Sequence, residues 1–466
     1  MNLLLALITF FLSVHGQSCS NFPVVDLGYA KHAPTIVNTT SSYNISYATY
    51  ANIRFAQPPV GDLRFRKPKT PPPNNATVQN GIYERNATDC LISIPPGLAI
   101  APGVEGASWG SEDCLFLDVK IPEGARGAKL PVLHWLYGGG YIFGSKDWAG
   151  DPAGLFQTMP PGQKFITVSS NYRLGALGWM SSDGIDMDKN TGLWDALAAI
   201  EWTKEYISFF GGDPDDITVI GESAGGGIIH HLLTAHGGQG TVPFNKAILT
   251  SPGYRPHANR SAEMTQIYDQ FLNSTNCTEI ACLRALPTDK IAAANRDLLF
   301  NVPTSGWLGP SIGYGPITDG DLVPDLPDLL INQGKYHKSI QKVMTANMAH
   351  DGQYATTTVQ SLYPTNQSDA FDLFAQDVIY ACHVYNTAKI WGSNAYRYSM
   401  SIPPANHGQD QFYYFYAGGP VEATGVEFPN AATTMEEYFR EFIFDGRTGG
   451  DGCSRVHWPA YGTGGR

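Results

Sequence analysis

The join between a β-branched run and a sharp glycine turn near the middle of the chain constrains its fold most strongly. Ile217–Ile220 leads directly into Gly221-Glu222-Ser223-Ala224-Gly225, and the helix-compatible segment Ile228–Ala235 follows. A strand, a tight turn and a helix around G-x-S-x-G are the context of a nucleophile elbow. There, glycines relieve clashes, and the serine hydroxyl stands clear of the sheet at a helix N-terminus. The sequence therefore predicts a nucleophile at Ser223.

The same G-x-S-x-G pattern occurs twice more, around Ser108 and Ser311, because the chain is rich in glycine. Ser108 lies in a stretch of Gly, Pro and Ala with no β-run before it. Ser311 has Pro310 beside it and no helix-compatible segment after it. Only Ser223 has the strand and the helix that the motif needs, so we expect the other two to be ordinary loop serines.

Apolar β-like runs recur along the chain between helical or irregular stretches, with helix candidates at Leu193–Phe209 and Ile228–Ala235. This alternation predicts an α/β fold with a mostly parallel sheet covered by helices on both faces. Residues 253–327, rich in Asn, Thr and Pro, interrupt it and predict helices inserted over the top of the sheet, within a single domain spanning 17–466. The strand candidates are Leu130–Tyr137, Phe165–Ser169, Ile217–Ile220, Lys246–Thr250, Ser339–Ala346 and Ala395–Ile402.

The chain opens with an apolar stretch, Leu3–Val14, that is too short to span a bilayer. Val14 and Gly16 suit cleavage before Gln17, so residues 1–16 are predicted to be a secretion signal. No second apolar run of transmembrane length follows, and eight N-x-S/T sequons favour a glycosylated, secreted protein. The net charge of −12 argues against a nucleic-acid partner. The sequon asparagines are Asn38, Asn44, Asn75, Asn86, Asn259, Asn273, Asn276 and Asn366.

Seven cysteines follow the predicted signal, and in an oxidising compartment most of them should be paired. Cys277 and Cys282 are close enough in sequence to close a small loop, and Cys90 and Cys114 could close a larger one. At least one of the other three must be free or intermolecular. The chain has no C-x-x-C pair and no H-E-x-x-H, so the sequence predicts no metal site and no cofactor. The other three cysteines are Cys19, Cys382 and Cys453.

A serine hydroxyl needs an adjacent base, which is itself oriented by a carboxylate. On a sheet with this elbow the chain order is serine, acid, histidine, which leaves His383, His407 and His457 as bases. His407 is favoured because it lies in the loop directly after Ala395–Ile402, and such loops meet at one edge of a parallel sheet. We expect His383 and His457 to be packing residues.

The acid should follow another strand. Ser339–Ala346 runs into the loop that holds Asp351, which makes Asp351 the leading candidate. Asp319 is the rival, but it precedes Gly320, and Asp-Gly is a common turn pair.

The developing oxyanion of an acyl transfer needs hydrogen-bond donors. Gly138, Gly139 and Gly140 follow the run Leu130–Leu136. Consecutive glycines let bare amides converge on one small volume, together with the amide of Ala224 after the nucleophile.

Together these motifs resemble the type-B carboxylesterase and cholinesterase-like family of α/β-hydrolases, in particular its secreted fungal members. The resemblance covers most of the chain and implies a central, mostly parallel twisted sheet flanked by helices, with helical insertions over an active-site gorge. The matching segments, beside the elbow, are Asn52–Phe65, Ser111–Leu115, Asn171–Gly175 and Gly192–Asp195.

The resemblance implies a role for each matching residue. It assigns Ser223, Asp351 and His407 as the catalytic triad, although the family's acid is usually Glu, so the shorter Asp351 must sit closer. It implies that Glu222 and Ser251 steer the histidine, and that Arg64 with Glu112 and Arg173 with Asp195 are structural ion pairs. The implied oxyanion donors are Gly139, Gly140 and Ala224, and the implied disulfides are Cys90–Cys114 over the gorge, Cys277–Cys282 and Cys382–Cys453.

The leading functional hypothesis is a secreted serine carboxylesterase that forms an acyl-enzyme. A lipase is the alternative, in which Leu91, Ile92, Ile94, Leu98 and Ile100 of the Cys90–Cys114 loop form a mobile lid. A non-catalytic adhesion protein of the same fold is the distant alternative, disfavoured because the nucleophile, base and glycines are all present. A cholinesterase is not expected, because Trp109 lies nearer Cys114 than the family's choline-binding tryptophan.

Overall fold

The computed structural model describes residues 22–40, 44–84, 86–95, 104, 106–148, 151–160, 162–257, 259–301, 314–352, 373–449 and 456–463. The predicted signal, residues 1–16, lies outside these ranges. Most of the strands belong to one large mixed sheet. Its strands are β3 (Ile36–Thr39), β4 (Ser46–Arg54), β8 (Phe116–Pro122), β9 (Leu130–Leu136), β10 (Ile166–Ser170), β11 (Gly212–Glu222), β12 (Lys246–Thr250), β13 (Lys342–Met348) and β14 (Ala395–Met400).

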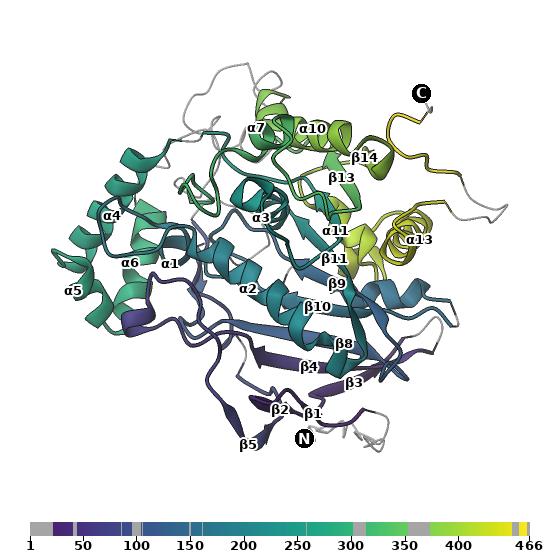
Figure 1. Ribbon diagram of the computed structural model, residues 1–466, viewed down its shortest axis with the longest axis horizontal. Coiled ribbons are helices and arrows are strands. Elements are labelled where there is room, and N and C mark those ends of the chain that lie inside the picture. The colour runs from purple at the N-terminus through teal and green to yellow at the C-terminus, as the bar shows by residue number, and fades with distance from the viewer. Residues whose placement is uncertain are drawn as a thin grey trace, which may run out of the picture.

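Among the described residues the strand order of this sheet is β14-β13-β12-β11-β9-β10-β8-β4-β3 (Figure 1). The run from β14 to β10 is parallel throughout, and it consists of the six strands that the sequence predicts. Strand β12 has the predicted bounds, whereas β11 begins five residues earlier than the predicted Ile217. The prediction of a mostly parallel sheet is confirmed for this half of the molecule.

The other half of the sheet is antiparallel and was not predicted. Strand β8 pairs antiparallel with both β10 and β4, and β4 pairs antiparallel with β3. Charged residues interrupt the apolar pattern of β8, since Asp118 and Lys120 lie within it. Asp118 is nonetheless buried, because it forms an ion pair with the buried Lys146 at 3.0 Å. The described residues also form two small sheets. One consists of β1 (Val25–Asp26), β2 (Ala30–His32) and β5 (Asn74–Gln79), and the other of β6 (Ile92–Ser93) and β7 (Ser108–Trp109).

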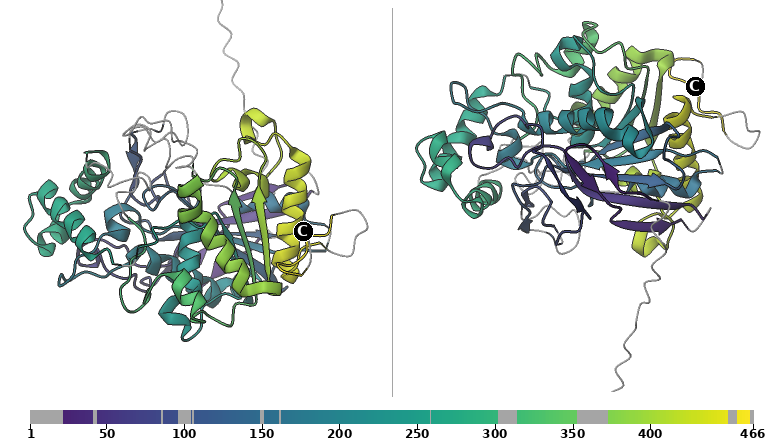
Figure 2. Two further views of the ribbon diagram at one scale, coloured as in Figure 1. Left: turned by 90° about the horizontal axis from the view of Figure 1, so that it is seen from above. Right: turned by 60° about the horizontal axis from the view of Figure 1, so that its bottom comes forward.

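Helices cover both faces of the sheet, as predicted. In Figure 2 (left) β13 and β14 lie between α10 and α13. Tyr396 and Tyr398 of β14 share one face and contact Phe442 and Phe439 of α13. The helices are α1 (Gly175–Trp179), α2 (Thr191–Tyr206), α3 (Ala224–Leu233), α4 (Ser261–Thr275), α5 (Ile280–Ala285), α6 (Thr288–Asn301), α7 (Pro327–Asn332), α10 (Cys382–Trp391), α11 (Gln409–Tyr414), α12 (Val421–Thr424) and α13 (Pro429–Asp445).

The interruption of the strand–helix alternation predicted for residues 253–327 is present. Helices α4, α5 and α6 lie between β12 and β13 in the chain, and in Figure 1 they gather beside α1 at the left end of the molecule. No helix in the described part of the chain is long and apolar enough to cross a membrane.

The described residues form two disulfides, and both pairs are among those expected from the sequence. Cys90–Cys114 joins Cα atoms 4.9 Å apart, and Cys277–Cys282 joins Cα atoms 5.6 Å apart. Cys382 is exposed and has no disulfide partner among the described residues. Cys19 and Cys453 lie outside the described ranges, so the pair Cys382–Cys453 stays a prediction.

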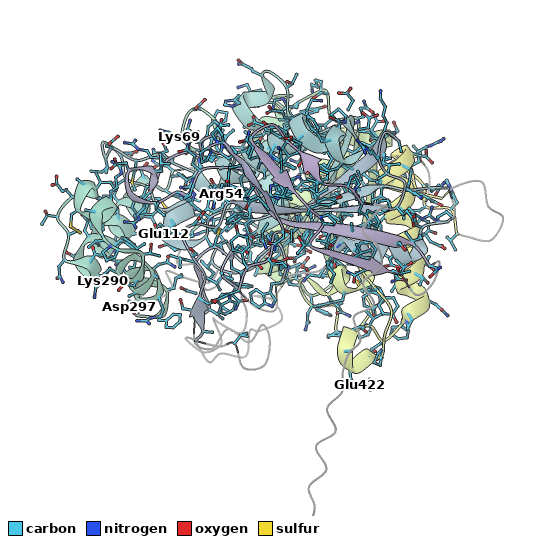
Figure 3. All side chains as sticks on the ribbon, turned by 90° about the horizontal axis from the view of Figure 1, so that it is seen from below. Arg54, Lys69, Glu112, Lys290, Asp297 and Glu422 are labelled. Atoms are coloured by element: carbon cyan, nitrogen blue, oxygen red, sulfur yellow. A yellow bond between two sulfur atoms is a disulfide. The ribbon has the colours of Figure 1, made fainter. Side chains whose placement is uncertain are left out.

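Both ion pairs implied by the resemblance are present and buried. Arg64 Nε lies 2.6 Å from Glu112 Oε1, and Arg173 Nε lies 2.7 Å from Asp195 Oδ2. Arg64 also donates to the carbonyl of Leu283 at the end of α5, and Thr288 of α6 donates to Glu112. Figure 3 shows Glu112 on the side of the molecule where Lys290 and Asp297 of α6 lie. The pair therefore ties the inserted helices to the sheet domain.

Replacing Glu112 with alanine should lower the free energy of unfolding by about 3–5 kcal/mol, because it leaves the buried Arg64 charge uncompensated. Denaturant titration followed by circular dichroism measures this loss. Asp215→Ala is the matched control, since Asp215 pairs with Lys204 at 3.0 Å on the surface, where such a pair contributes less than about 1 kcal/mol. Equal stability of Glu112→Ala and the unmodified protein would show that this pair does not hold the inserted helices.

Candidate active site

The elbow has the strained geometry that its sequence predicts. Strand β11 ends at Glu222 and α3 begins at Ala224, so Ser223 alone makes the turn, with φ 54° and ψ −121°. A Cβ atom at Gly225 would lie 2.1 Å from the carbonyl oxygen of Leu136 in β9, which only glycine avoids. The close packing of α3 on β9 thus holds the Ser223 side chain at the carboxyl edge of the sheet.

Three side chains from distant parts of the chain meet at this edge. The Nε2 atom of His407 lies 2.7 Å from Ser223 Oγ, and its Nδ1 atom lies 2.8 Å from Asp351 Oδ1. Asp351 follows β13 and His407 follows β14, which are neighbouring parallel strands of the sheet. Hydrogen bonds of these lengths connect the three groups in the order that acyl-transfer chemistry requires.

Hydrogen bonds to both oxygens fix the Asp351 carboxylate. The hydroxyl of Ser251 lies 2.9 Å from Oδ1 and 3.0 Å from Oδ2, and the Met348 amide donates to Oδ2 at 2.7 Å. The side chain is fully buried. These donors fix the carboxylate so that Oδ1 faces His407, although aspartate is shorter than the family's usual glutamate.

The glycine-rich segment after β9 lies against the elbow. A Cβ atom at Gly138 would lie 2.3 Å from Glu222 Oε2 and 2.8 Å from the Cβ of Ser223. Gly139 and Gly140 follow directly. Ala224 is the first residue of α3, and the first amides of a helix have no carbonyl partner within that helix. The three predicted oxyanion donors therefore belong to segments that flank Ser223.

Two further carboxyl groups, those of Glu222 and Asp410, interact electrostatically with His407. Glu222 Oε1 lies 3.3 Å from His407 Nε2, and burial raises the pKa of Glu222 to about 8. Burial also raises the pKa of the Asp410 carboxyl, which accepts a hydrogen bond from Tyr398, to about 7. Burial acts to lower the pKa of His407, but the Glu222 and Asp351 carboxylates outweigh it and raise that pKa to about 9. When Glu222 rather than His407 holds the proton, the imidazole is neutral.

Replacing Glu222 with glutamine should move the acid limb of the kcat/KM profile to lower pH, by on the order of one unit. Among the groups that raise the pKa of His407, Glu222 acts most strongly, so its removal lowers that pKa. The neutral imidazole is the active base, and activity is lost as pH falls through the imidazole pKa. Steady-state kinetics across pH test this, with the exposed Glu205→Gln as control. An acid limb that stays in place or moves upward would contradict the assignment.

The alternatives raised by the sequence lie elsewhere. His383 is buried and bonds Asp328, and His457 is exposed. Asp319 accepts the backbone amides of Asp321 and Val323, as a turn former does. Ser108 lies in the short strand β7, not in the predicted loop, and donates to the carbonyl of Ile92, while Ser311 lies outside the described residues.

A second serine–histidine contact exists in the core. His134 Nε2 lies 2.8 Å from Ser170 Oγ, but its Nδ1 bonds the hydroxyl of Thr203 and not a carboxylate. His134 and Ser170 are fully buried within the sheet, and burial lowers the pKa of His134 to about 3. This contact is a structural hydrogen bond between strands β9 and β10 and helix α2.

The structure adds neighbours of His407 that the sequence analysis did not single out. The ring of Tyr380 lies 4.4 Å from the imidazole centroid, and a Cβ at Gly253 would meet that tyrosine ring at 2.7 Å. Tyr380 is carried by a π-helical turn, Asp377–Ala381, a feature that no pattern of apolar residues signals. Asp410 could have been found, because it lies three residues after His407 at the start of α11.

Comparisons with known proteins show the family to which the chain belongs. The model of the Carboxylesterase family matches residues 35–363. The chain is 31% identical over 520 residues to carboxylesterase patB of Aspergillus clavatus, covering 95% of this chain and 91% of that protein. The chain belongs to the carboxylesterase family.

This carboxylesterase is also 32% identical over 345 residues to Lipase 1 of Geotrichum candidum, covering 65% of this chain and 59% of the lipase. Its fold matches the crystal structure of Aspergillus niger EstA with a TM-score of 0.78 and 26% identity, over 96% of this chain and 93% of that one. The predicted α/β-hydrolase fold and the predicted family are confirmed, and the fungal relatives are consistent with the predicted fungal character. The protein is a carboxylic ester hydrolase.

Proposed function

We propose that this carboxylesterase is a secreted serine esterase that uses Ser223 as nucleophile, His407 as general acid and base, and Asp351 as the group that orients the imidazole. The observation that carries the proposal is the hydrogen-bonded line Ser223–His407–Asp351, with contacts of 2.7 and 2.8 Å. A non-catalytic adhesion protein has no need of such a line beside a strained serine.

In the acylation step, Ser223 Oγ attacks the ester carbonyl carbon while His407 Nε2 takes the hydroxyl proton. The carbonyl oxygen becomes an oxyanion that accepts hydrogen bonds from the amides of Gly139, Gly140 and Ala224. One such donor typically stabilises the transition state by about 3–4 kcal/mol. The tetrahedral intermediate then collapses, the C–O bond to the alcohol breaks, and His407 returns the proton to the leaving oxygen.

In the deacylation step, water takes the place of the alcohol. His407 Nε2 accepts a proton from water, and the resulting hydroxide oxygen attacks the acyl carbon of the Ser223 ester. Collapse breaks the bond to Ser223 Oγ, which regains its proton from His407, and the carboxylic acid leaves. The buried Asp351 carboxylate stabilises the imidazolium in both steps without taking its proton.

The esterase is favoured over the lipase with a mobile lid. Leu91, Ile92 and Ile94, three of the apolar residues in the Cys90–Cys114 loop, are buried, with at most 4% exposure. Ser93 between them donates its amide to the carbonyl of Ile142 beside the glycine-rich segment. Leu98 and Ile100 lie outside the described residues. Because this part of the loop is packed, it supports the interpretation of the loop as a fixed wall and not a mobile lid.

Measuring hydrolysis of soluble 4-nitrophenyl butyrate and of an emulsified long-chain triacylglycerol tests this choice. We expect saturation kinetics on the soluble ester below its solubility limit, with no rise in rate once an interface forms. A jump in rate on crossing the solubility limit would favour the lipase. Absence of hydrolysis of every ester tested would overturn the esterase itself.

Secretion is supported by the positions of the sequons. Seven of the eight sequon asparagines lie in described segments and all seven are exposed, while Asn366 lies outside them. We expect chain produced by a secreting eukaryotic host to lose mass when treated with a peptide-N-glycosidase. An unchanged mass would contradict glycosylation at these sites.

A further inference from the structure

Two histidines and an aspartate point toward one another from three different helices, one of which is α3, the helix that follows the nucleophile. His230 comes from α3, Asp328 from α7 and His383 from α10, and each offers one ligand atom within 4.8 Å of the others. Both imidazoles are buried, at 0% and 2% exposure. We propose that this cluster binds one zinc ion, as a structural site separate from the candidate active site.

The donor set suits zinc, which in proteins takes imidazole nitrogens and carboxylate oxygens. Metal ligands are usually held by hydrogen bonds to their remote atoms. Here His230 Nε2 lies 3.0 Å from the hydroxyl of Thr387, and Asn386 donates to Asp328 Oδ1 at 2.8 Å. Both partners come from α10, so this helix supplies one ligand and the groups that orient the other two.

His230 also keeps one buried nitrogen, Nδ1, without a hydrogen-bond partner among the described residues. A buried polar atom without a partner costs free energy, and a metal ion removes that cost when it accepts the lone pair.

Without a metal ion, hydrogen bonds hold the cluster together. Asp328 Oδ2 lies 2.5 Å from His383 Nδ1 and 2.7 Å from the hydroxyl of Tyr254. Two ligands of one zinc ion lie about 3.3 Å apart, given bonds of about 2.0–2.1 Å in a tetrahedron. The carboxylate must therefore turn slightly when zinc enters. Asp328 has room to do so because its side chain is 26% exposed, which also gives the ion an entry route.

Zinc at this position would join three segments that are far apart in the sequence. Helix α3 follows Ser223 directly, and α10 leads into β14, after which His407 lies. The ion would fix the nucleophile helix to the helix that precedes the base, so its main effect is on stability and not on the chemical step. No sequence motif indicates this cluster, because its ligands lie 98 and 55 residues apart in the chain.

The test uses untagged protein, freed of metal with a chelator and titrated with zinc chloride. We expect one zinc per chain by mass spectrometry of the bound metal after desalting, together with a rise in Tm. Cobalt in place of zinc should give the visible absorption of a tetrahedral site.

Asp328→Asn and His383→Gln should each weaken zinc binding at least tenfold and remove the rise in Tm. His236→Gln is the control, because His236 pairs with Asp321 on the surface and lies outside the cluster. Circular dichroism shows whether each variant folds, and a folded Asp328→Asn keeps the test valid if His383→Gln does not fold. Less than stoichiometric zinc in the unmodified protein, or equal affinity in the folded variants, would overturn the site.

Discussion

Replacing Ser223 with alanine should lower kcat by about a million-fold, the size of effect seen when a serine nucleophile is removed from such a triad. The reason is that the Ser223 hydroxyl lies 2.7 Å from the imidazole of His407, which takes its proton. Hydrolysis of a soluble 4-nitrophenyl ester measures the loss. The fold should persist, because the change removes one oxygen atom at a position that is 8% exposed.

Ser108→Ala is the matched control for this variant, since Ser108 lies in the same G-x-S-x-G pattern. Ser108 belongs to the two-residue strand β7, and its hydroxyl donates to the carbonyl of Ile92 at 2.9 Å. We expect kcat within a few-fold of the unmodified enzyme. Full activity in Ser223→Ala, or loss of activity in Ser108→Ala alone, would place the nucleophile elsewhere.

Asp351→Asn should lower kcat by about ten thousand-fold with little change in structure. The amide oxygen of asparagine would face the Met348 N–H, which donates to Oδ2 in the native protein. The amide nitrogen would then face His407 Nδ1 and donate to it. The imidazole would carry its own proton on Nε2, toward Ser223, and so could not accept the serine proton.

Asp319→Asn is the control for the acid, because Asp319 is the rival that the sequence offers. Its Oδ1 accepts the amides of Asp321 and Val323, and its Oδ2 accepts the side chain of Asn190 at 2.7 Å. The variant should lose some stability but keep kcat within a few-fold. The opposite outcome, a severe loss in Asp319→Asn and none in Asp351→Asn, would contradict the assigned acid.

The parallel half of the fold could be predicted because its strands are apolar runs buried on both faces. Lys246–Thr250 is one such run, and its bounds agree with β12. The antiparallel half could not be predicted in the same way. Asp118 interrupts β8, and its burial depends on tertiary contacts with Lys146 and with the Asn52 amide. A buried charge of this kind has no signature in a single segment.

The candidate site shows the same division. Ser223, Asp351 and His407 each follow a strand, and the carboxyl ends of neighbouring parallel strands meet at one edge, so their convergence could be predicted. Tyr380 could not, because it reaches His407 from a π-helical turn. The raised pKa of Glu222 likewise depends on burial among groups that converge only in the folded chain.

Covalent labelling with a fluorophosphonate tests most directly whether His407 activates Ser223. The reagent forms a bond to an activated serine oxygen and releases fluoride, and peptide mass spectrometry locates the adduct. We predict one adduct per chain, on Ser223, formed at least a thousand-fold more slowly in His407→Ala. An adduct on another residue, or labelling of His407→Ala at the rate of the unmodified enzyme, would contradict this mechanism.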